Sequence, residues 1–326
     1  MSISEEKFKI GTTYLLPFEK LHGLGNDFVV VNNAHLPEDS HTEYEQELTK
    51  KICDRNRGIG GDGFIVIDNV KESSEAIRSW RYYNSDGSIG EMCGNGIRCA
   101  AKYIYEHGLS GEETQFKIET LAGDIGIELL DDEMVKVDMG PPRKIEENLS
   151  LTVDNFKFDY TNVSMGNPHA IAFFDDIEAV KHHGPAIEVH KNFPNKTNVE
   201  FAQILLKKSC REKSSDTRLA SSEQAELTNP SMMTAKNERN AVDEALRGGS
   251  NIKLIVWERG CGFTQACGTG ACATVVAAIL KGHCKKDEDI TVKLPGGDLI
   301  IRWDSVAETI FMTGKAEMSF LGYYNA

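Results

Sequence analysis

The sequence predicts a mixed α/β (α+β) protein made of two similar halves, and three observations carry this prediction. First, one short pattern occurs twice, as Cys93-Gly94-Asn95-Gly96 and Cys267-Gly268-Thr269-Gly270, 174 residues apart (from 93 to 267). Second, a run typical of a helix follows each copy, whereas short alternating or apolar runs typical of strands fill most of the remainder. Third, Gly140-Pro141-Pro142 interrupts the chain between the copies. We therefore expect two domains, each with one cysteine-capped helix surrounded by strands.

The elements expected in the first half are strands around one helix. Apolar and β-branched runs predict strands at 14–22, 28–32, 64–67 and 80–83, and a helix is predicted at 42–54. After Cys93 and its helix, alternating runs predict strands at 116–120, 125–129 and 135–139. Gly58, Gly60 and Gly63 match a dinucleotide-binding spacing, but a helix precedes them and a strand follows, the reverse of that fingerprint. We expect a tight connection there whose backbone lines the site.

The second half repeats this arrangement. Strands are predicted near 151–160 and at 170–174, 198–204 and 252–257, with a helix at about 176–183. After the second cysteine and its helix, strands are predicted at 290–294, 299–303 and 309–313. The charged stretch 207–250 has few apolar residues and is expected to be a polar surface insertion. The predicted domains are 1–139 with 309–326, carrying Cys93, and 140–308, carrying Cys267.

Composition excludes several classes of function. The chain has 326 residues and a formal net charge of −14 at pH 7, whereas surfaces for nucleic acid or anionic membranes need clustered positive charge. No apolar run approaches the roughly 20 residues that cross a bilayer. The first residues resemble neither a secretory signal nor a transit peptide. We expect a cytoplasmic protein that binds neither nucleic acid nor membrane; an organelle is the alternative if a targeting segment has been removed.

The eight cysteines are expected to be reduced thiols. They stand at 53, 93, 99, 210, 261, 267, 272 and 284 of a long chain without a secretory signal, which does not indicate a disulfide framework. None forms the Cys-x-x-Cys pair that is typical of structural zinc sites. The sequence has no motif for an organic cofactor either, so we expect neither a metal nor a cofactor.

The two repeated cysteines are expected at helix N-termini, where position has chemical consequences. The first N–H groups of a helix lack partners within the helix, and the helix dipole places partial positive charge there. Such an end binds an anion and favours ionisation of a thiol. Two such ends suit proton transfer at the carbon next to a carboxylate, with a thiolate on one face and a thiol on the other. The alternative is that Cys93 and Cys267 are buried packing residues, which the following glycines, costly in a plain helix, disfavour.

Polar residues in turns are the other candidates for the site. Asn26 lies in a glycine-supported turn and Asn84 ends a strand, where each amide could meet a ligand or serve only as an ordinary turn residue. His169 follows a proline in a loop. On local grounds alone, Glu258 and Arg259 are equally well a surface ion pair of little energetic value.

Several segments, taken together, resemble the diaminopimelate epimerase family, in order and over nearly the whole chain. They are LHGLGNDF at 21–28, NSDGS at 84–88, CGNGIRC at 93–99, GNPH at 166–169, WERG at 257–260 and CGTG at 267–270. The resemblance implies a cofactor-independent epimerase that interconverts LL- and meso-2,6-diaminopimelate on the route to lysine. It also implies a fold of two similar domains, each a curled, mostly antiparallel sheet around a central helix.

The resemblance also implies roles for residues of this chain. Cys93 and Cys267 would be the acid/base pair, with His169 accompanying the first sulfur and Glu258 the second. The groups that would hold the substrate's ammonium and carboxylate groups are Asn26, Asn84, Asn167, Asn198, Glu258 and Arg259, with the backbone N–H groups of Gly94, Asn95, Gly268 and Thr269 on the reacting carboxylate. The implied partner is the small-molecule substrate, and a homodimer is the assembly considered.

Two features depart from the family's pattern. Many members carry a glutamine where this chain has Gly63, so one side-chain contact would be missing or replaced by backbone or water. The stretch 207–250 interrupts a connection that is usually short, which leaves the chemistry intact if the stretch loops outward.

Three other functions fit parts of the pattern. A proline or hydroxyproline racemase also uses two cysteines, although the asparagines and the Glu-Arg pair suit a substrate with a second amino-acid end better than a bare ring. A thiol redox protein would pair Cys93 with Cys267 as a regulatory disulfide, and a cysteine metal site would bind zinc. Proton exchange with each substrate, and zinc binding by the native protein, distinguish these functions.

Overall fold

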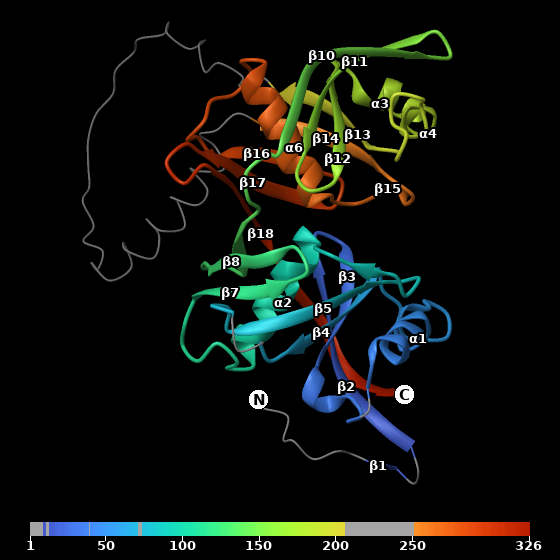
Figure 1. The fold of residues 1–326 in the computed structure, drawn as a ribbon, viewed down its shortest axis with the longest axis vertical. Coiled ribbons are helices and arrows are strands. Elements are labelled where there is room, and N and C mark those ends of the chain that lie inside the picture. The colour runs from blue at the N-terminus through green and yellow to red at the C-terminus, as the bar shows by residue number, and fades with distance from the viewer. Residues whose placement is uncertain (1–8, 11–12, 39, 71–73, 206–250) are drawn as a thin grey trace, which may run out of the picture.

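The molecule has two lobes that are joined by strands (Figure 1). The structure is a computed structural model, and it describes residues 9–10, 13–38, 40–70, 74–205 and 251–326. The predicted insertion at 207–250 therefore lies outside the described residues. Within the described ranges, no helix is long and apolar enough to cross a membrane.

The first lobe consists of a curled sheet, the central helix α2 and a smaller outer helix, α1 (Figure 1). Helix α1 precedes the glycine-rich turn and strand β4 follows it, as the sequence predicted. The elements in chain order are β1 (Lys9–Ile10), β2 (Thr13–Gly23), β3 (Asn26–Asn32), the 3-10 helix η1 (Asn33–His35), α1 (Thr42–Cys53), β4 (Gly63–Asp68), β5 (Arg78–Asn84), β6 (Ile89–Gly90), α2 (Gly94–Glu106), β7 (Gln115–Thr120), β8 (Gly123–Leu129) and β9 (Met134–Asp138).

The second lobe has the same plan, with α6 as its central helix. The elements are β10 (Lys144–Val153), β11 (Phe156–Ser164), β12 (Pro168–Phe173), α3 (Ile177–Val180), the 3-10 helix η2 (Lys181–His183), α4 (Gly184–Glu188), β13 (Asn198–Leu205), β14 (Asn251–Glu258), β15 (Gly262–Phe263), α6 (Gly268–Leu280), β16 (Ile290–Leu294), β17 (Gly297–Asp304), β18 (Thr309–Lys315) and β19 (Glu317–Asn325).

The two lobes repeat one pattern of strand pairing. In the first lobe β2–β3, β4–β5, β7–β8 and β8–β9 are antiparallel, whereas β3–β4 and β5–β7 are parallel. In the second lobe β11–β12, β13–β14, β16–β17 and β17–β18 are antiparallel, whereas β12–β13 and β14–β16 are parallel. Each of these strands thus has a counterpart at the same place in the other lobe. The predicted duplication and the mostly antiparallel sheets are confirmed.

Each sheet packs around its own helix. Helix α2 contacts β2, β3, β4, β8 and β9, and α6 contacts their counterparts β11, β12, β13, β17 and β18. On α2, the side chains of Ile97, Ala100 and Ile104 are fully buried. Residues 271–278 of α6 are all buried, as expected of a helix that is apolar nearly all round. The burial of both helices holds their N-termini in fixed places.

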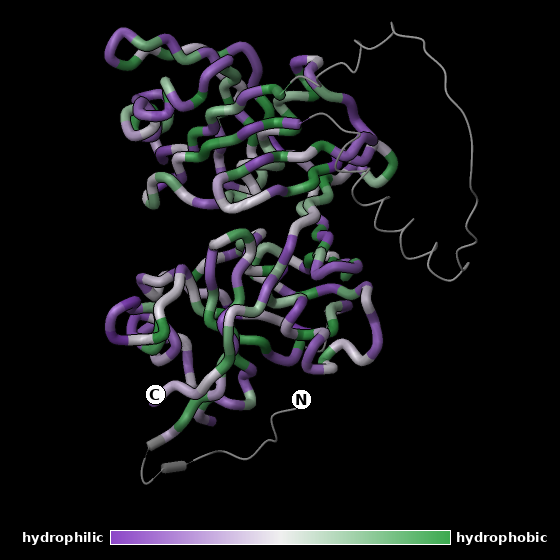
Figure 2. Tube along the Cα trace, turned by 180° about the vertical axis from the view of Figure 1, so that it is seen from behind, coloured by the Kyte–Doolittle hydropathy of each residue, from purple (hydrophilic) through white to green (hydrophobic). Residues whose placement is uncertain are grey.

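A second apolar layer covers the outer face of each sheet. In the first lobe, Leu48 and Ile52 of α1 pack against strands β3 and β4. In the second, Ile177 of α3 and Ile187 of α4 pack against β11 and β13. Figure 2 shows hydrophobic segments running through the interior of both lobes and hydrophilic loops on their outer sides. Each lobe therefore has a core on both faces of its sheet.

The end of the chain returns to the first lobe. Strand β18 pairs with β17 of the second lobe and with β9 of the first, so it joins the two sheets. Strand β19 pairs with β2. We propose the division into domains that the sequence suggested, 1–139 with 309–326 and 140–308. The pairing of β19 supports this division, whereas β18 belongs to both sheets.

Several elements differ from the sequence predictions, among them the three that follow and the short elements β1, η1, β6 and β15. Strand β10 begins at Lys144, earlier than predicted, because its first residues are exposed and carry little apolar signal. The helix predicted at 176–183 is divided into α3, η2 and α4, because Gly184 and Pro185 begin a new helical turn. The prediction did not include β19, whose residues are largely exposed.

Candidate active site

Cys93 and Cys267 occupy equivalent positions, the N-caps of α2 and α6. Cys93 has extended backbone angles (φ −137°, ψ 117°), and its sulfur accepts the N–H of Gly96 at 3.5 Å. Cys267 has similar angles (φ −120°, ψ 107°), and its sulfur accepts the N–H of Gly270 at 3.4 Å. Each sulfur takes the place that a hydroxyl or carboxylate oxygen takes in most N-caps. The predicted position of both cysteines at helix N-termini is confirmed.

The first turns of the two helices lie against each other. A side-chain carbon added to Gly94 would lie 3.6 Å from Cα of Gly268, and one added to Gly268 would lie 3.5 Å from Cα of Gly94. The carbon added to Gly268 would also lie 2.9 Å from Sδ of Met312, closer than such atoms approach. Glycine after each cysteine therefore allows the two helix ends to meet, which gathers their unpaired N–H groups in one region.

The side chain of Asn95 bridges the two cysteine loops. Its Nδ2 donates to Oδ1 of Asn26 at 3.0 Å and to the carbonyl oxygen of Ala266 at 2.9 Å. The same oxygen of Asn26 faces the thiol of Cys93 at 3.9 Å. The structure thus brings Asn26, Asn95 and both cysteine loops together. Asn95 is 2% exposed, and its side chain is held by these protein contacts.

Charged residues of the glycine-rich turn orient Asn26. Nδ2 of Asn26 donates to Oδ2 of Asp62 at 2.7 Å, and Asp62 is held by Arg55 at 2.8 Å. Arg55 also binds both carboxylate oxygens of Asp27, at 3.0 and 2.7 Å. The sequence analysis considered only the backbone of this turn, whereas the structure shows the Asp62 side chain bonded to Asn26. A carboxylate directly after three glycine positions is the signal that would have indicated it.

Tyr82 fills the space beside Gly63 and orients Asn84. Its hydroxyl donates to Oδ1 of Asn84 at 2.8 Å, while Nδ2 of Asn84 donates to Oγ of Ser88 at 2.9 Å. A carbon added to Gly63 would lie 2.7 Å from Cε2 of Tyr82. No larger residue fits there without movement, so Tyr82 occupies the region that a longer side chain at 63 would enter. Burial raises the pKa of Tyr82, and its interaction with Cys93 raises that pKa further.

A chain of hydrogen bonds leads from Cys267 to His169. The sulfur of Cys267 lies 3.6 Å from Oγ1 of Thr269, which accepts Nδ2 of Asn167 at 3.2 Å. Oδ1 of Asn167 bonds Nε2 of His169 at 2.9 Å, and Nδ1 of His169 bonds Glu200 at 2.6 Å. Because both ring nitrogens are occupied, the hydrogen bonds of His169 lead to the Cys267 side of the site rather than to Cys93.

Glu200 is a site residue that the sequence analysis missed. It is fully buried on β13, two residues after Asn198 and therefore on the same face of the strand. A carbon added to Gly270 would lie 3.0 Å from its Oε1 and 3.2 Å from the sulfur of Cys267. Burial raises the pKa of Glu200, against the favourable interaction with His169. A glutamate inside an apolar strand prediction is the signal that would have identified it.

Glu258 and Asn198 lie on the same side of the site. Oε1 of Glu258 accepts the hydroxyl of Thr264 at 2.5 Å. Burial raises the pKa of Glu258, and hydrogen bonds from Thr264 and Cys267 oppose that rise. Asn198 accepts the backbone N–H of Arg259 at 2.8 Å and donates to the carbonyl of Pro168 at 2.9 Å. Asn198 therefore fixes the segment that carries Glu258 and Arg259.

Burial changes the ionisation expected for Cys93. The sequence analysis predicted that a helix N-terminus eases loss of the thiol proton. In the structure, burial raises the pKa of Cys93, and the carboxylate of Glu258 raises it too, against the N–H of Gly96 and the guanidinium of Arg98. The prediction is wrong for the substrate-free site, because desolvation of a thiolate outweighs the stabilisation by the helix end.

The pKa of Cys267 is also raised, and by more than that of Cys93. Burial raises its pKa well above the ordinary value, and the carboxylates of Glu258 and Glu200 add to the rise. The Thr269 hydroxyl and the N–H of Gly270 oppose it. The two thiols therefore sit in unequal surroundings although their local sequences match.

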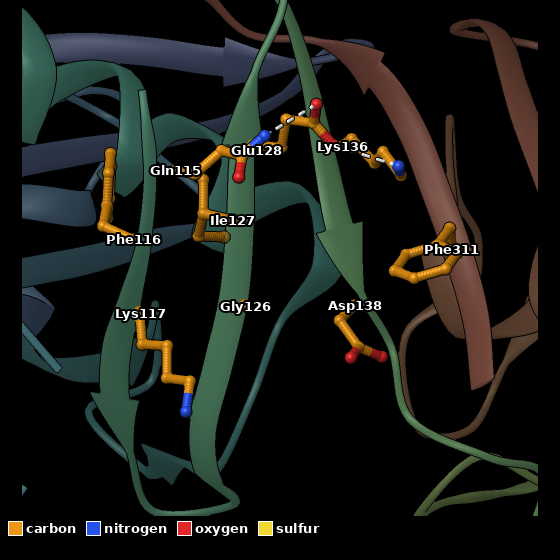
Figure 3. A pocket seen from close by; sticks show the side chains of 9 residues that line it. All are labelled: Gln115, Phe116, Lys117, Gly126, Ile127, Glu128, Lys136, Asp138 and Phe311. Atoms are coloured by element: carbon orange, nitrogen blue, oxygen red, sulfur yellow. Dashed lines mark hydrogen bonds and ion pairs between the residues drawn. The ribbon is translucent and has the colours of Figure 1, made fainter. Parts of the chain in front are cut away.

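A hollow of about 350 Å³ lies elsewhere, on the face formed by β7, β8, β9 and β18 (Figure 3). Its lining residues are Gln115, Phe116, Lys117, Gly126, Ile127, Glu128, Lys136, Asp138 and Phe311, and they include none of the residues predicted for the site. Its lysines already have partners: Lys136 pairs with Glu128 at 3.0 Å and Lys117 with Glu75 at 2.6 Å. We therefore place the candidate site at the two helix ends.

Relatives with curated names match nearly the whole chain. The sequence matches the family model for diaminopimelate epimerase over residues 18–145 and 231–319. It is 41% identical over 322 residues to the diaminopimelate epimerase of Carboxydothermus hydrogenoformans, a match that covers 95% of this chain and 99% of that protein. It is 40% identical over 328 residues to the diaminopimelate epimerase of Bacillus cytotoxicus, covering 94% of this chain and 96% of that protein.

Solved structures of other proteins share the fold. A hydroxyproline epimerase from Agrobacterium vitis superposes with a TM-score of 0.61 at 14% identity, covering 95% of this chain and 92% of the other. A phenazine biosynthesis protein of the PhzF family from Bacillus anthracis gives 0.63 at 15% identity, covering 96% of this chain and 99% of the other. At such identities the likeness shows the fold alone. The family model and the relatives at about 40% identity establish more: this chain belongs to the diaminopimelate epimerase family.

Proposed function

We propose that the chain interconverts LL- and meso-2,6-diaminopimelate without a cofactor, using Cys93 and Cys267 as its two bases. Family membership supports the substrate, the isomerase reaction and the place in lysine biosynthesis. The observation that carries the mechanism is the meeting of two cysteine-capped helix ends at Gly94 and Gly268. Diaminopimelate, a small amino acid, is the partner of this site.

The reaction moves one proton and inverts one carbon. A thiolate takes the α-hydrogen from one face, and the electron pair of the broken C–H bond moves into the adjacent carboxylate, which becomes an enolate-like dianion. The thiol on the opposite face then gives its proton to the carbon, so that the sulfur which began as a thiol ends as a thiolate. Atoms and charge balance without a further reactant. The reverse reaction starts from that state.

The helix ends stabilise the charge that develops on the carboxylate. Gly94 and Asn95 open α2, and Gly268 and Thr269 open α6, where N–H groups lack partners within the helix. Both helices direct the positive ends of their dipoles to this place, so they stabilise a dianionic intermediate more than a monoanionic substrate. This preference lowers the barrier to removing the α-hydrogen.

Glu258 and His169 are proposed to control protons on the Cys267 side. Glu258 hydrogen-bonds the Cys267 side chain, and its raised pKa brings it closer to that of a thiol. A carboxyl group with such a pKa exchanges a proton with the sulfur at a smaller difference in free energy. His169 acts through Asn167 on Thr269, which lies beside the sulfur.

The remaining polar residues are proposed to hold the substrate's ammonium and carboxylate groups. The hydrogen bonds described above fix the orientation of every amide in this set, so the site is preorganised and little ordering is needed on binding. The set is Asn26, Asn84, Asn167, Asn198, Glu258 and Arg259.

The test of the two-base mechanism is α-hydrogen exchange in deuterated water under reducing conditions, with LL- and meso-diaminopimelate. Cys93→Ala and Cys267→Ala should each reduce inversion by about 10³-fold or more. The matched controls are Cys99→Ala and Cys272→Ala, which remove fully buried thiols from the same helices and should leave inversion intact. Inversion that survives in Cys93→Ala or Cys267→Ala would contradict the mechanism. Exchange with proline instead of diaminopimelate would contradict the substrate.

A homodimer is the proposed assembly. Strand β19 presents Met318, Phe320, Leu321 and Tyr323, each with between 43% and 53% of its surface exposed. A cluster of exposed apolar side chains on one strand is typical of an interaction surface. Sedimentation of the unmodified chain should give twice the mass of Leu321→Glu, and equal masses would contradict the dimer.

The cytoplasm is the proposed location. Among the described residues, no two cysteines form a disulfide, as is usual in a reducing compartment. Fractionation of the producing cells tests this assignment.

A further inference from the structure

Arg98 lies in the second turn of α2 and is completely buried, with 0% of its surface exposed. Its guanidinium has four contacts with acceptors. Nε donates to the carbonyl of Lys315 at 3.2 Å and Nη2 donates to Oδ1 of Asn95 at 3.0 Å. Nη1 donates to the carbonyl of Gly94 at 3.1 Å and faces Sδ of Met312 at 3.7 Å. All four acceptors are uncharged.

The charge of Arg98 has no carboxylate partner among the residues that the structure describes. A second arginine of the same lobe, Arg81, shows the ordinary solution, because it pairs with Glu45 at 2.8 Å and also with Asp68. A buried charge without a counter-charge is energetically costly, and burial lowers the pKa of Arg98 accordingly. Such a local conflict is characteristic of a functional position.

The guanidinium lies directly behind the junction of the two helix ends. Met312, which it contacts, packs against both Gly94 and Gly268. Glycines of β2 and β18 leave room for it: a carbon added to Gly23 would lie 2.8 Å from Nη2, and one added to Gly314 would lie 3.4 Å from Cζ. Elements of both sheets therefore enclose the charge next to the site.

Arg98 also determines the orientation of Asn95. Because Oδ1 of Asn95 accepts the guanidinium, Nδ2 points the other way and reaches Asn26 and the carbonyl of Ala266. Ala266 directly precedes Cys267 in the chain. Rotation of this amide by 180° would place Oδ1 of Asn95 against the oxygens of Asn26 and Ala266. Arg98 prevents this rotation because its guanidinium binds Oδ1 on the other side. The bridge between the cysteine loops therefore depends on the arginine.

We propose that Arg98 is a positioning residue of the epimerisation site: it holds Asn95 across the two cysteine loops and supplies a buried positive charge behind the helix ends that bind the reacting carboxylate. The inference rests on the proposed function. The charge acts in the same sense as the two helix dipoles, so it stabilises an anion at the site, whether the thiolate or the dianionic intermediate.

The other titratable groups around this charge are few. Cys93 and Cys99 of α2 and Cys272 of α6 interact with the guanidinium. On Cys93, Glu258 of β14 acts in the opposite sense to Arg98, and Tyr82 of β5 also interacts with this thiol. Lys102, on the solvent side of α2, acts on Cys99. A change in the ionisation of Cys93 on loss of the Arg98 charge is therefore measurable against this background.

Two substitutions separate the charge from the hydrogen bonds. Arg98→Lys keeps the charge and loses the planar fork, whereas Arg98→Gln keeps a donor and loses the charge. We expect kcat to fall about 100-fold in Arg98→Gln and about 10-fold in Arg98→Lys, with smaller changes in KM, because preorganised electrostatic groups act on the transition state. The midpoint at which kcat/KM rises with pH should move upward in Arg98→Gln and stay unchanged in Arg98→Lys.

Arg81→Gln is the matched control. It removes a partly buried arginine from the same lobe, and it should lower the melting temperature without changing kcat or the pH midpoint. Alkylation of Cys93 by iodoacetamide, followed against pH in the native protein, gives the midpoint without turnover. If Arg98→Gln does not fold, Arg98→Met, which places an unbranched uncharged side chain there, removes the charge instead and should produce the same upward shift.

The outcomes separate this inference from the proposed function. A folded Arg98→Gln protein with the kcat and midpoint of the unmodified chain would overturn the role of Arg98, and so would an equal shift in Arg98→Lys. If the unmodified chain does not epimerise diaminopimelate, the proposed function fails, and the alkylation midpoints still decide whether Arg98 sets the charge at Cys93.

Discussion

The two cysteine-capped helices begin alike and differ in what lies behind them. A carbon added to Gly96 would lie 3.3 Å from Cδ1 of Ile65 on β4, whereas one added to the equivalent Gly270 would lie 3.0 Å from the carboxylate of Glu200 on β13. Five residues after Cys93 stands Arg98, and five residues after Cys267 stands Cys272. Glu258 and Arg98 therefore act on the pKa of Cys93 in opposite senses, whereas Glu258 and Glu200 both raise the pKa of Cys267.

Because of this difference, one duplicated pattern can serve two chemical roles, that of a thiolate base and that of a thiol acid. Two thiols in one site do not ionise together easily, so they share one proton. Arg98 opposes the rise in the pKa of Cys93, whereas Glu258 and Glu200 increase the rise at Cys267. We infer that in the substrate-free enzyme Cys93 loses its proton more readily and Cys267 retains its own. The duplication gives the two helix ends the same geometry, and the different charges beside them determine which of the two thiols ionises first.

Among the charged residues beside the two sulfurs, the largest effect is expected from Glu258→Gln. This substitution removes the carboxyl group that hydrogen-bonds Cys267, and loss of such an acid/base group typically costs about 100-fold or more in rate. Initial rates of epimerisation measure it, and the thiol alkylation midpoint of Cys267 should fall at the same time. A midpoint that stays in place would contradict the electrostatic link between the two residues. Glu188→Gln, a change at a carboxylate held by Trp257 away from the cysteines, is the control.

A smaller loss is expected from Glu200→Gln. Glu200 supports His169 rather than contacting the sulfur through a hydrogen bond, and loss of such a supporting group costs about 10-fold. The substitution makes the second end more like the first, where Ile65 stands. The midpoint of Cys267 should move downward and that of Cys93 should stay constant. An equal change in the alkylation midpoints of Cys93 and Cys267 would show that Glu200 affects the pKa of both thiols alike.

Substitution of the two meeting glycines should affect stability unequally. In Gly268→Ala the new carbon would lie 2.9 Å from Sδ of Met312, in the middle of that side chain, whereas in Gly94→Ala it would lie 3.0 Å from the terminal Cε, which can move. We expect Gly268→Ala to lower the free energy of unfolding by about 1–3 kcal/mol and Gly94→Ala by less. Denaturant unfolding measures both, and the reverse order would contradict the contact between the helix ends.

The smallest effect concerns stability at high pH. Burial raises the pKa of Cys99 and of Cys272 from 9.0 to about 12. Between these values the unfolded chain loses the thiol protons while the folded chain keeps them, so the free energy of unfolding should be constant below pH 9 and fall as pH rises toward 12. Denaturant unfolding at pH 8 and pH 10 measures the fall, which Cys99→Ala should reduce. A stability that does not change over this range would contradict the burial of the thiols.

Much of the site could be predicted from sequence because it depends on local pattern. A cysteine followed by Gly-x-Gly and an apolar run identifies a capped helix, and both caps are where the sequence placed them. The duplication was also visible in the order of strands. Of the residues drawn from the resemblance, Asn26 lies beside the Cys93 cap, whereas Asn167 and His169 are hydrogen-bonded toward the Cys267 cap. Arg259 is exposed, and its guanidinium donates to the carbonyl of Asn195.

The remainder depended on long-range contacts that local pattern does not contain. Arg98 and Glu200 are charged residues that are completely buried. The apolar residues beside them in the sequence do not identify their distant partners, which are Met312 and Lys315 for Arg98 and His169 for Glu200. β19 was missed because its exposed alternation has meaning only beside β2, nearly the whole chain away. The direction of the thiol pKa was mistaken for the same reason, since the helix end is local and desolvation is not.

The most direct test of this account is the pH dependence of alkylation at Cys93 and Cys267 in the native, substrate-free protein, resolved by peptide mass spectrometry. Midpoints are compared rather than rates, so that unequal access to the two sulfurs does not matter. We expect a lower midpoint for Cys93 than for Cys267. A lower midpoint for Cys267, or identical midpoints, would contradict the asymmetry on which the account depends.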